Sequence, residues 1–447
     1  MRFVDTLKNI WSIQELRKRL LITLGLVFVY RLGCFVVLPG ISPEAIKALG
    51  EFTNKSGLMQ LLDMFSGGAF SQASIFALGI MPYITASIVI QLLGMVMPYF
   101  QKLQREGESG HMKINQYTRY LTVLILILQA PAYLYNLEYQ VNSAHAGTMV
   151  LDAWSKTYMT IILAAGSMFI MWLGERITDK GVGNGISFII LIGIIARFPG
   201  AISEEFVGRI SDAQGGLVML VVELIVLFAV IAGAVLLVQG TRKVPVQYAK
   251  RIIGNKQYGG ARQYIPLKVN AAGVMPIIFA QAIMFIPLTL AGFGSQGQAS
   301  SFVQALTNMQ GFWYNLIYFL MIVAFTYFYT AITVRPTQMA DDMKRNNGFI
   351  PGVKPGKKTA DYLDSIMSRI TLPGSIFLGI VAIMPAFASI CGVKHSFAQF
   401  FGGTSLLIMV GVVLDTLQQI ESHLLMHHYD GLMKSGKLKG RTTGQGY

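Results

Sequence analysis

The stretch GLVMLVVELIVLFAVIAGAVLLV occupies residues 216–238 and carries a single charged side chain, Glu223. A helix rises about 1.5 Å per residue, so about 20 apolar residues cross the roughly 30 Å hydrocarbon core of a bilayer. An open sheet would leave backbone groups without partners in lipid, whereas a helix pairs them internally. The stretch therefore predicts a transmembrane helix.

The rest of the chain repeats this pattern. The mean hydropathy is +0.53 and 13% of the 447 residues are charged, too few to cover the surface of a water-soluble fold of this size. Nine further apolar runs predict spans near residues 20–38, 75–97, 118–137, 157–174, 184–200, 271–292, 312–333, 371–391 and 403–421. The expected fold is therefore an all-α polytopic membrane protein with ten transmembrane helices.

The basic residues indicate how these helices are oriented. With the N-terminus inside, 29 of the 36 Lys and Arg residues fall on the cytoplasmic side and six on the opposite side. Because Lys and Arg collect in cytoplasmic loops, both termini are predicted to be cytoplasmic. The first span follows Arg17-Lys18-Arg19 without a small-residue cleavage site, which predicts a retained helix and not a removable signal peptide. Ten spans divided five and five form two inverted halves, an arrangement that surrounds a central pathway.

These spans predict the organisation of the whole chain. The expected parts are a cytoplasmic segment (1–19), an N-terminal half (20–200), a C-terminal half (201–421) and a cytoplasmic tail (422–447). Two cytoplasmic loops, 239–270 and 334–370, are longer than adjacent helices need, and each carries seven basic residues. Such loops are expected to dock a partner, and the residues alone leave RNA phosphates and an acidic protein face both open.

A short apolar segment interrupts the pattern between the first two spans. It runs from Ser56 to Ile75 and contains Gly67-Gly68. It is too short to cross a bilayer, so it is either re-entrant, with its irregular backbone inside the protein, or an external amphipathic helix. The residues by themselves leave both alternatives open.

Few polar groups lie within the predicted spans. Arg31, Glu223 and Asp415 are the ionisable ones, on three different helices, and the amides Gln91, Gln129 and Gln281 fit either helix contacts or a pathway lining. An ion-coupled transporter normally clusters its carboxylates or histidines, so this scatter disfavours a secondary transporter without excluding it.

No motif predicts catalysis, a metal or a cofactor. The Gly431–Lys437 stretch has phosphate-loop spacing but is followed by Leu438 where a hydroxyl is needed. Gly181-Val-Gly-Asn-Gly185 could cradle an anion, but because it joins two spans it is expected to be a tight turn. His423 and His427 lack a third zinc ligand.

Several motifs together resemble the bacterial SecY family. They include Met64-Phe-Ser-Gly-Gly-Ala69, Glu106-Gly-Glu-Ser-Gly110, Gly183-Asn-Gly-Ile-Ser187, Ala360-Asp-Tyr-Leu-Asp364 and Phe401-Gly-Gly-Thr-Ser405. They occur in the family's order from about residue 15 to the tail. The resemblance implies a channel through which proteins cross the bacterial cytoplasmic membrane, made of two five-helix halves. A secondary transporter and a structural subunit of a larger complex are the competing hypotheses.

The resemblance also implies how such a channel is sealed. A re-entrant plug at residues 57–73 is expected to close the outer side, and a ring of apolar side chains to close the waist. The plug residues are Met64, Phe65, Ser66, Gly67 and Gly68. The ring residues are Ile80, Ile84, Ile190, Ile278, Ala282 and Ile408. A dry apolar ring blocks ions because they cannot replace their lost hydration there.

Hydrophobic segments are expected to leave sideways through a gate between the halves, with polar positions at Ser87, Gln91, Gln129 and Gln281. The implied partners are small SecE- and SecG-like subunits, the SecA ATPase, the ribosome with its rRNA, signal peptides and nascent proteins, and membrane lipids. The docking residues are Lys250, Arg251, Lys256, Arg262, Lys344, Arg345, Lys354, Lys357 and Lys358. Lys354 departs from the family's usual arginine and lacks its planar fork, and Asn255 occupies a position that is often basic.

Overall fold

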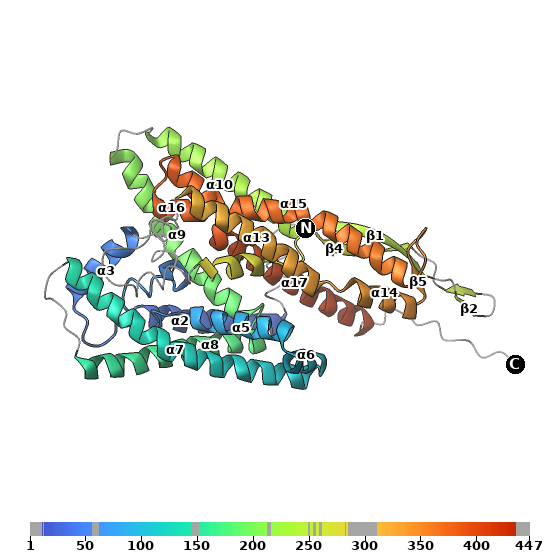
Figure 1. Ribbon diagram of the computed structural model, residues 1–447, viewed down its shortest axis with the longest axis horizontal. Coiled ribbons are helices and arrows are strands. Elements are labelled where there is room, and N and C mark those ends of the chain that lie inside the picture. The colour runs from blue at the N-terminus through green and yellow to red at the C-terminus, as the bar shows by residue number, and fades with distance from the viewer. Residues whose placement is uncertain are drawn as a thin grey trace. The chain divides into compact units, whose positions relative to one another are not determined.

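The computed structural model describes residues 11, 13–55, 62–144, 152–211, 216–248, 251–253, 256–258, 262–281, 283–284 and 311–434. The chain divides into two compact units, which Figure 1 shows as ribbons. One unit comprises Met1–Arg197 and Val412–Tyr447, and the other comprises Phe198–Gly411.

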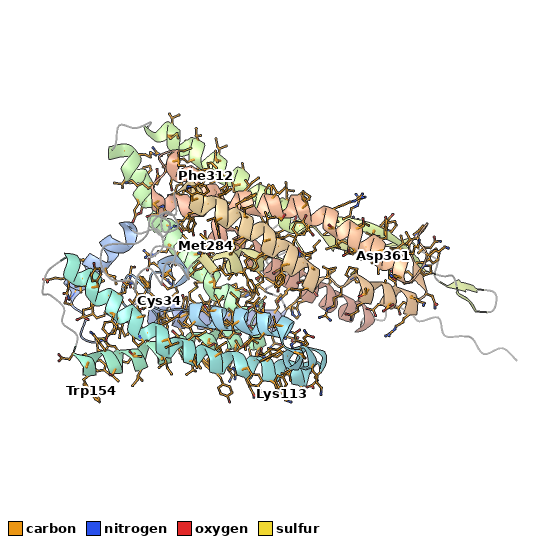
Figure 2. All side chains as sticks on the ribbon, viewed as in Figure 1. Cys34, Lys113, Trp154, Met284, Phe312 and Asp361 are labelled. Carbon is orange, nitrogen blue, oxygen red and sulfur yellow. The ribbon has the colours of Figure 1, made fainter. Side chains whose placement is uncertain are left out.

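The first unit consists of helices. They are α2 (Gln14–Cys34), α3 (Pro43–Lys55), α5 (Met81–Val96), α6 (Pro98–Arg105), α7 (Glu108–Ala144), α8 (Ala153–Lys180), the first part of α9 (Gly185–Ser211) and the last part of α17 (Gly403–Lys434). Helices α7 and α8 are antiparallel: Lys113, near the start of α7, and Trp154, at the start of α8, lie at opposite ends of this unit (Figure 2).

Helix α8 shows why these helices pack as they do. Its buried residues, including Met159, Leu163, Ile170 and Ile177, recur every three or four positions and therefore share one face. Small residues on that face, Gly166 and Gly174, allow neighbouring backbones to approach closely, as is usual between membrane helices. The remaining faces of the unit expose large apolar side chains that suit contact with lipid.

The second unit combines helices with a small sheet. Its helices are the end of α9, α10 (Gly216–Gln239), α13 (Phe312–Thr333), α14 (Pro336–Arg345), α15 (Lys357–Ile390), the short α16 (His395–Ala398), the 3-10 turn η1 (Gln399–Phe401) and the start of α17. Helix α10 exposes Val218, Ile225 and Phe228 among many apolar side chains. Such a surface requires an apolar solvent.

Seven described helices are long and apolar enough to cross a membrane, or eight if α5 and α6 are one span bent by 102°. Ten spans were predicted, and three of them are not among these seven helices. Helix α2 carries Arg17, Lys18, Arg19 and Arg31 within 21 residues. The predicted span 75–97 begins with turns and becomes helical at Met81. The predicted span 271–292 extends beyond the described residues.

The described residues of the two long loops that were predicted to be cytoplasmic are folded, which was not expected from the sequence. Strand β1 (Thr241–Tyr248) pairs antiparallel with β4 (Arg262–Lys268) and with β5 (Gly348–Phe349), in the order β4-β1-β5. In this register Val244 opposes Ile265, and Gln247 opposes Phe349. Strands β2 (Arg251–Ile253) and β3 (Lys256–Tyr258) form a separate hairpin. The predicted 334–370 loop also contains helix α14, turns within residues 350–356 and the first turns of α15.

Candidate functional site

The described part of the re-entrant segment, residues 62–80, lies inside the first unit. One helical turn at 62–65 leads into consecutive turns, and α5 begins at Met81. Gly67 and Gly68 have φ values of 67° and 92°, in the left-handed region that favours glycine. Most of its side chains are buried, which agrees with the re-entrant alternative and not with an external helix. Residues 56–61 of the predicted plug lie outside the described residues.

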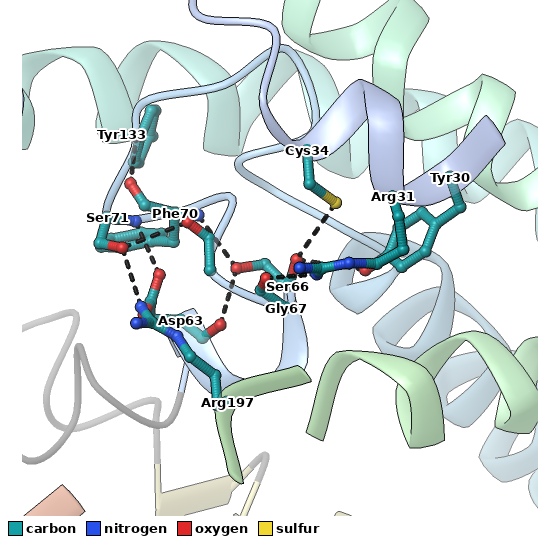
Figure 3. Close-up of polar contacts among 11 residues, drawn as sticks. Tyr30, Arg31, Cys34, Asp63, Ser66, Gly67, Phe70, Ser71, Tyr133 and Arg197 are labelled. Carbon is teal, nitrogen blue, oxygen red and sulfur yellow. Dashed lines mark hydrogen bonds and ion pairs between the residues drawn. The ribbon is translucent and has the colours of Figure 1, made fainter. Parts of the chain in front are cut away.

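Helix α2 holds one side of this segment (Figure 3). Tyr30 donates a hydrogen bond from its hydroxyl to the carbonyl of Ser66 (3.1 Å), and Arg31 donates to the carbonyl of Gly67 (2.7 Å). The thiol of Cys34 lies 3.8 Å from the same Ser66 oxygen. Arg31, which the sequence places within a span, thus satisfies the Gly67 carbonyl, which the glycine turn leaves without a helical partner.

Helices α7 and α9 hold the other side. The Tyr133 hydroxyl on α7 donates to the carbonyl of Phe70 (3.1 Å). Arg197 on α9 is ion-paired with Asp63 and also donates to the hydroxyl of Ser71 (2.9 Å). The other Asp63 oxygen accepts from the backbone N–H of Ser71 (2.7 Å), as Figure 3 shows. Neither Asp63 nor Arg197 is among the site residues predicted from the sequence.

Close backbone approach fits the segment between its neighbours. A Cβ on Gly193 of α9 would lie 3.0 Å from the carbonyl oxygen of Phe65 and 3.2 Å from the nitrogen of Gly67. A Cβ on Gly166 of α8 would overlap the carbonyl of Ile75. The return of the chain is fixed by an antiparallel bridge between Val37 and Ser74. Glycine is therefore required on the helices around the segment as well as within it.

The predicted ring residues are distributed over both units. Ile80 and Ile190 are buried and Ile84 is half-buried in the first unit, where the N–H of Ile84 donates to the carbonyl of Ile80 (3.1 Å). Ile408 is buried and Ile278 is half-buried in the second unit. Ala282 lies outside the described residues. The ring as a closed set stays a prediction.

The predicted gate amides differ in their surroundings. Gln91 donates to the hydroxyl of Ser87 one turn earlier on α5 (3.4 Å). Gln129 is exposed on α7, and Gln281 is buried in the second unit. Ser87 and Gln91 are thus partners on one face of α5, while Gln129 and Gln281 belong to separate elements.

In the turn at residues 181–185, three backbone N–H groups donate to side-chain oxygens, so these groups do not form an anion site. The N–H of Val182 donates to Thr23 Oγ1 on α2 (3.2 Å), and that of Gly183 donates to Gln419 Oε1 on α17 (2.9 Å). Gly185 donates to Thr178 Oγ1 (2.9 Å). The turn therefore anchors the start of α9, and with it Ile190, to two other helices of its unit.

The β4-β1-β5 sheet and the helices packed on it carry the predicted docking residues. Its core packs β1, β4, α14 and α15 together and contains Val244, Val246, Leu267, Met343, Ile350, Leu363 and Met367. Of the docking residues, Lys344, Arg345, Lys354, Lys357 and Lys358 are exposed. Lys250 lies outside the described residues, and only the backbone is described for Arg251, Lys256 and Arg262. One signal could have revealed strand β1, though not its partners: Val244 and Val246 alternate with exposed Lys243 and Pro245.

Among the described residues, no group of three or more His, Cys, Asp or Glu side chains could hold a metal ion. His395, in the connection between α15 and α17, is half-buried, and its burial lowers the pKa of the imidazole below the ordinary value. Its Nε2 lies 3.3 Å from the amide nitrogen of Gln399.

Long apolar helices, a buried re-entrant segment and a folded basic sheet together define a polytopic membrane protein. The SecY family model matches residues 74–417. The protein translocase subunit SecY of Streptomyces scabiei is 42% identical over 429 residues, 94% of this chain and 97% of that protein. SecY of Mycobacterium tuberculosis is 41% identical over 453 residues, 97% and 99% of the two chains. The chain belongs to the SecY family.

Solved structures agree in fold. A protein-conducting channel matches with a TM-score of 0.63 at 16% identity, over 100% of both chains. A structure concerned with the SecY plug domain, said there to stabilise the closed channel and maintain a membrane seal, matches at 0.57 and 17%, also over 100% of both. Sec61 in a canine ribosome-channel complex matches at 0.60 and 15%, again over 100% of both. The predicted all-helical polytopic fold is confirmed.

Family membership also confirms the predicted function. The chain is a translocase subunit that forms a protein-conducting channel, and it is not an enzyme. It is a bacterial multi-pass membrane protein. The competing transporter hypothesis is therefore wrong.

Proposed function

We propose that residues 57–73 act as the plug of this channel in the bacterial cytoplasmic membrane, with both termini in the cytoplasm. The observation that carries this proposal is the buried, hydrogen-bonded position of residues 62–80 within the first unit. Contacts from α2, α7 and α9 hold the segment, while Gly67 and Gly68 keep the backbone outside regular secondary structure. Because side-chain contacts hold the segment, and not a continuous helix or sheet, it can move out of its buried position as a unit once those contacts break.

The waist of the channel is the proposed second seal. Ile80, Ile84, Ile190, Ile278, Ala282 and Ile408 would form it, three from each unit. An ion that enters a dry ring of this kind loses hydration without gaining ligands, whereas an extended polypeptide can part the side chains. Ion tightness and peptide passage are then compatible in one pore.

Hydrophobic segments of the substrate would leave toward lipid past Ser87, Gln91, Gln129 and Gln281. Leu or Ile at a helix centre contributes roughly −0.3 to −0.6 kcal/mol to insertion, and Lys or Asp costs about +2.5 to +3.5 kcal/mol. A gate that opens to lipid therefore sorts signal peptides and membrane segments by hydrophobicity.

The β4-β1-β5 sheet is the proposed docking platform for the SecA ATPase and the ribosome on the cytoplasmic side. SecE- and SecG-like subunits are the proposed partners in the membrane. Two observations support the docking role. The sheet joins the two longest basic loops into one folded body, so their exposed lysines and arginines are held together. A structural relative occurs in a ribosome-channel complex. A positively charged, pre-organised surface attracts rRNA phosphate or an acidic protein face.

Deletion of residues 60–70 tests the plug. The reconstituted translocase should become leaky to ions while it still protects a secretory precursor in proteoliposomes with SecA and ATP. A deletion variant that translocates and remains as ion-tight as the unaltered channel would show that the segment is not a plug. If the unaltered channel, supplied with SecA and ATP, failed to protect the precursor, the docking proposal would be contradicted.

A further inference from the structure

Two charged residues in the first unit suggest how the plug is retained. We propose that Asp63 and Arg197 form an electrostatic latch that keeps the plug closed, so that the plug leaves only when this pair separates. The inference rests on the proposed plug role of residues 57–73. Asp63 belongs to the plug, and Arg197 belongs to α9, which stays in the channel wall.

Burial makes the partner of Asp63 obligatory. The Asp63 side chain is 2% exposed. A carboxylate removed from water in this way is stable only when it is paired and hydrogen-bonded. One oxygen is paired with Arg197, and the other accepts the backbone N–H of Ser71 at 2.7 Å. Arg197 in turn donates to the Ser71 hydroxyl at 2.9 Å, which closes a three-residue network.

This network differs in kind from the other polar contacts of the plug. Tyr30, Arg31 and Tyr133 donate to carbonyl groups of the plug backbone, which any plug sequence offers. The contacts of Arg197 instead depend on the side chains of Asp63 and Ser71 (Figure 3). The charge of the plug residue therefore determines how firmly this contact holds.

The two partners are not equivalent, because their exposure differs. The Arg197 side chain is 37% exposed, so its charge can be hydrated when Asp63 is lost. Asp63 has no such access to water. Loss of Arg197 should consequently destabilise the closed plug more than loss of the Asp63 charge, since it leaves an uncompensated buried carboxylate.

The test measures ion flux through the complete translocase, reconstituted in proteoliposomes without substrate. Arg197→Gln should raise the flux at least about tenfold, and Asp63→Asn should raise it less. The double variant should leak no more than Arg197→Gln alone, because both substitutions remove one interaction. Glu138→Gln is the matched control. It breaks a 2.7 Å ion pair with Lys156 that joins α7 to α8, and its flux should equal that of the unaltered channel.

The outcomes separate the latch from the plug itself. If deletion of residues 60–70 leaks but both single variants stay ion-tight, the plug stands and the latch is wrong. If the deletion is also tight, both proposals fall. Asp63→Asn keeps the side-chain shape and the acceptor for Ser71, so it decides the matter should Arg197→Gln fail to assemble. A tight Asp63→Asn channel would then overturn the latch.

Discussion

The guanidinium of Arg209, near the end of α9, is ion-paired with the carboxylate of Glu223 on α10, and their side chains are only 8% and 3% exposed. Glu205, one turn earlier on α9, pairs with the same guanidinium at 2.8 Å. Arg209 also donates to the carbonyl of Gly392 (3.0 Å), and the N–H of Lys394 donates to Glu205 (2.9 Å). This network ties α9 and α10 to the connection that follows α15.

Arg209→Leu should destabilise the protein by about 3–5 kcal/mol, because it leaves two buried carboxylates without a cation. The measurement is thermal or denaturant unfolding of the purified protein. Arg19→Gln is the control, since it breaks an ion pair with Glu15 on an exposed helix face. That pair is worth about 0.3–0.5 kcal/mol. Equal stability of the two variants would show that the Arg209 network contributes nothing beyond a surface pair.

Gly193→Ala should increase the ion leak of the closed channel. Its new methyl group would contact the backbone of Met64, Phe65 and Gly67 at 3.0–3.2 Å, so the plug must shift. Overpacking of this kind typically costs about 1–3 kcal/mol. The control is Gly200→Ala on the same helix, where a methyl group meets nothing within 4 Å. A leak that is the same in both variants would contradict close plug packing against α9.

Leu363→Ala should loosen the β4-β1-β5 sheet without affecting membrane insertion. Leu363 on α15 is 1% exposed within the core that joins β1, β4 and α14. Leucine-to-alanine changes at such sites cost about 2–5 kcal/mol. Limited proteolysis should cut the sheet faster, and SecA binding should weaken. Tyr264→Ser, at an exposed position of β4, should change proteolysis little. Unchanged cleavage of the Leu363 variant would show that the loops do not share a core.

Acid should destabilise the protein through His395. Its imidazole has a lowered pKa because it is removed from water. Above the ordinary histidine pKa of about 6.5, the imidazole is neutral in both the folded and the unfolded protein, so burial of His395 does not reduce the stability of the fold. As the pH falls from there toward the folded pKa, the unfolded state binds the proton first, and stability is lost.

His395→Gln should therefore flatten the dependence of unfolding temperature on pH between about pH 7 and 5. His111→Gln, at an exposed position of α7, is the control and should leave the dependence as in the unaltered protein. A His395 variant that loses stability in acid as steeply as the control would show that another group is responsible.

The local features of the chain were predictable because they depend on neighbours in sequence. The stretch 216–238 forms a helix from Gly216 to Gln239, and 312–333 forms a helix with the predicted bounds. The glycines at 67 and 68 marked an irregular segment, which is what the backbone shows. The glycine-rich stretch 181–185 was expected to be a tight turn and not an anion site, and it forms a short bend between α8 and α9.

Contacts between distant residues were not predictable in this way. Asp63 and Arg197 are 134 residues apart, and Gly183 and Gln419 are 236 apart. A lone Asp in an apolar segment and a lone Arg at the end of a span have no pattern that assigns them to each other. Likewise, positive-inside bias explained the charge of the two long loops, and their pairing through Gln247 and Phe349 had no counterpart in local periodicity.

The sequence by itself determined that the chain is a membrane protein and, through its motifs, its family. Membrane character follows from the solvent preference of each apolar run, and family membership follows from short motifs. Neither depends on contacts between distant residues. Only the tertiary structure decided that the re-entrant segment is buried, that the two basic loops share one sheet, and which charges are paired. Burial and pairing depend on the backbone path that brings distant elements within hydrogen-bond distance, and that path is set by the packing of the whole unit.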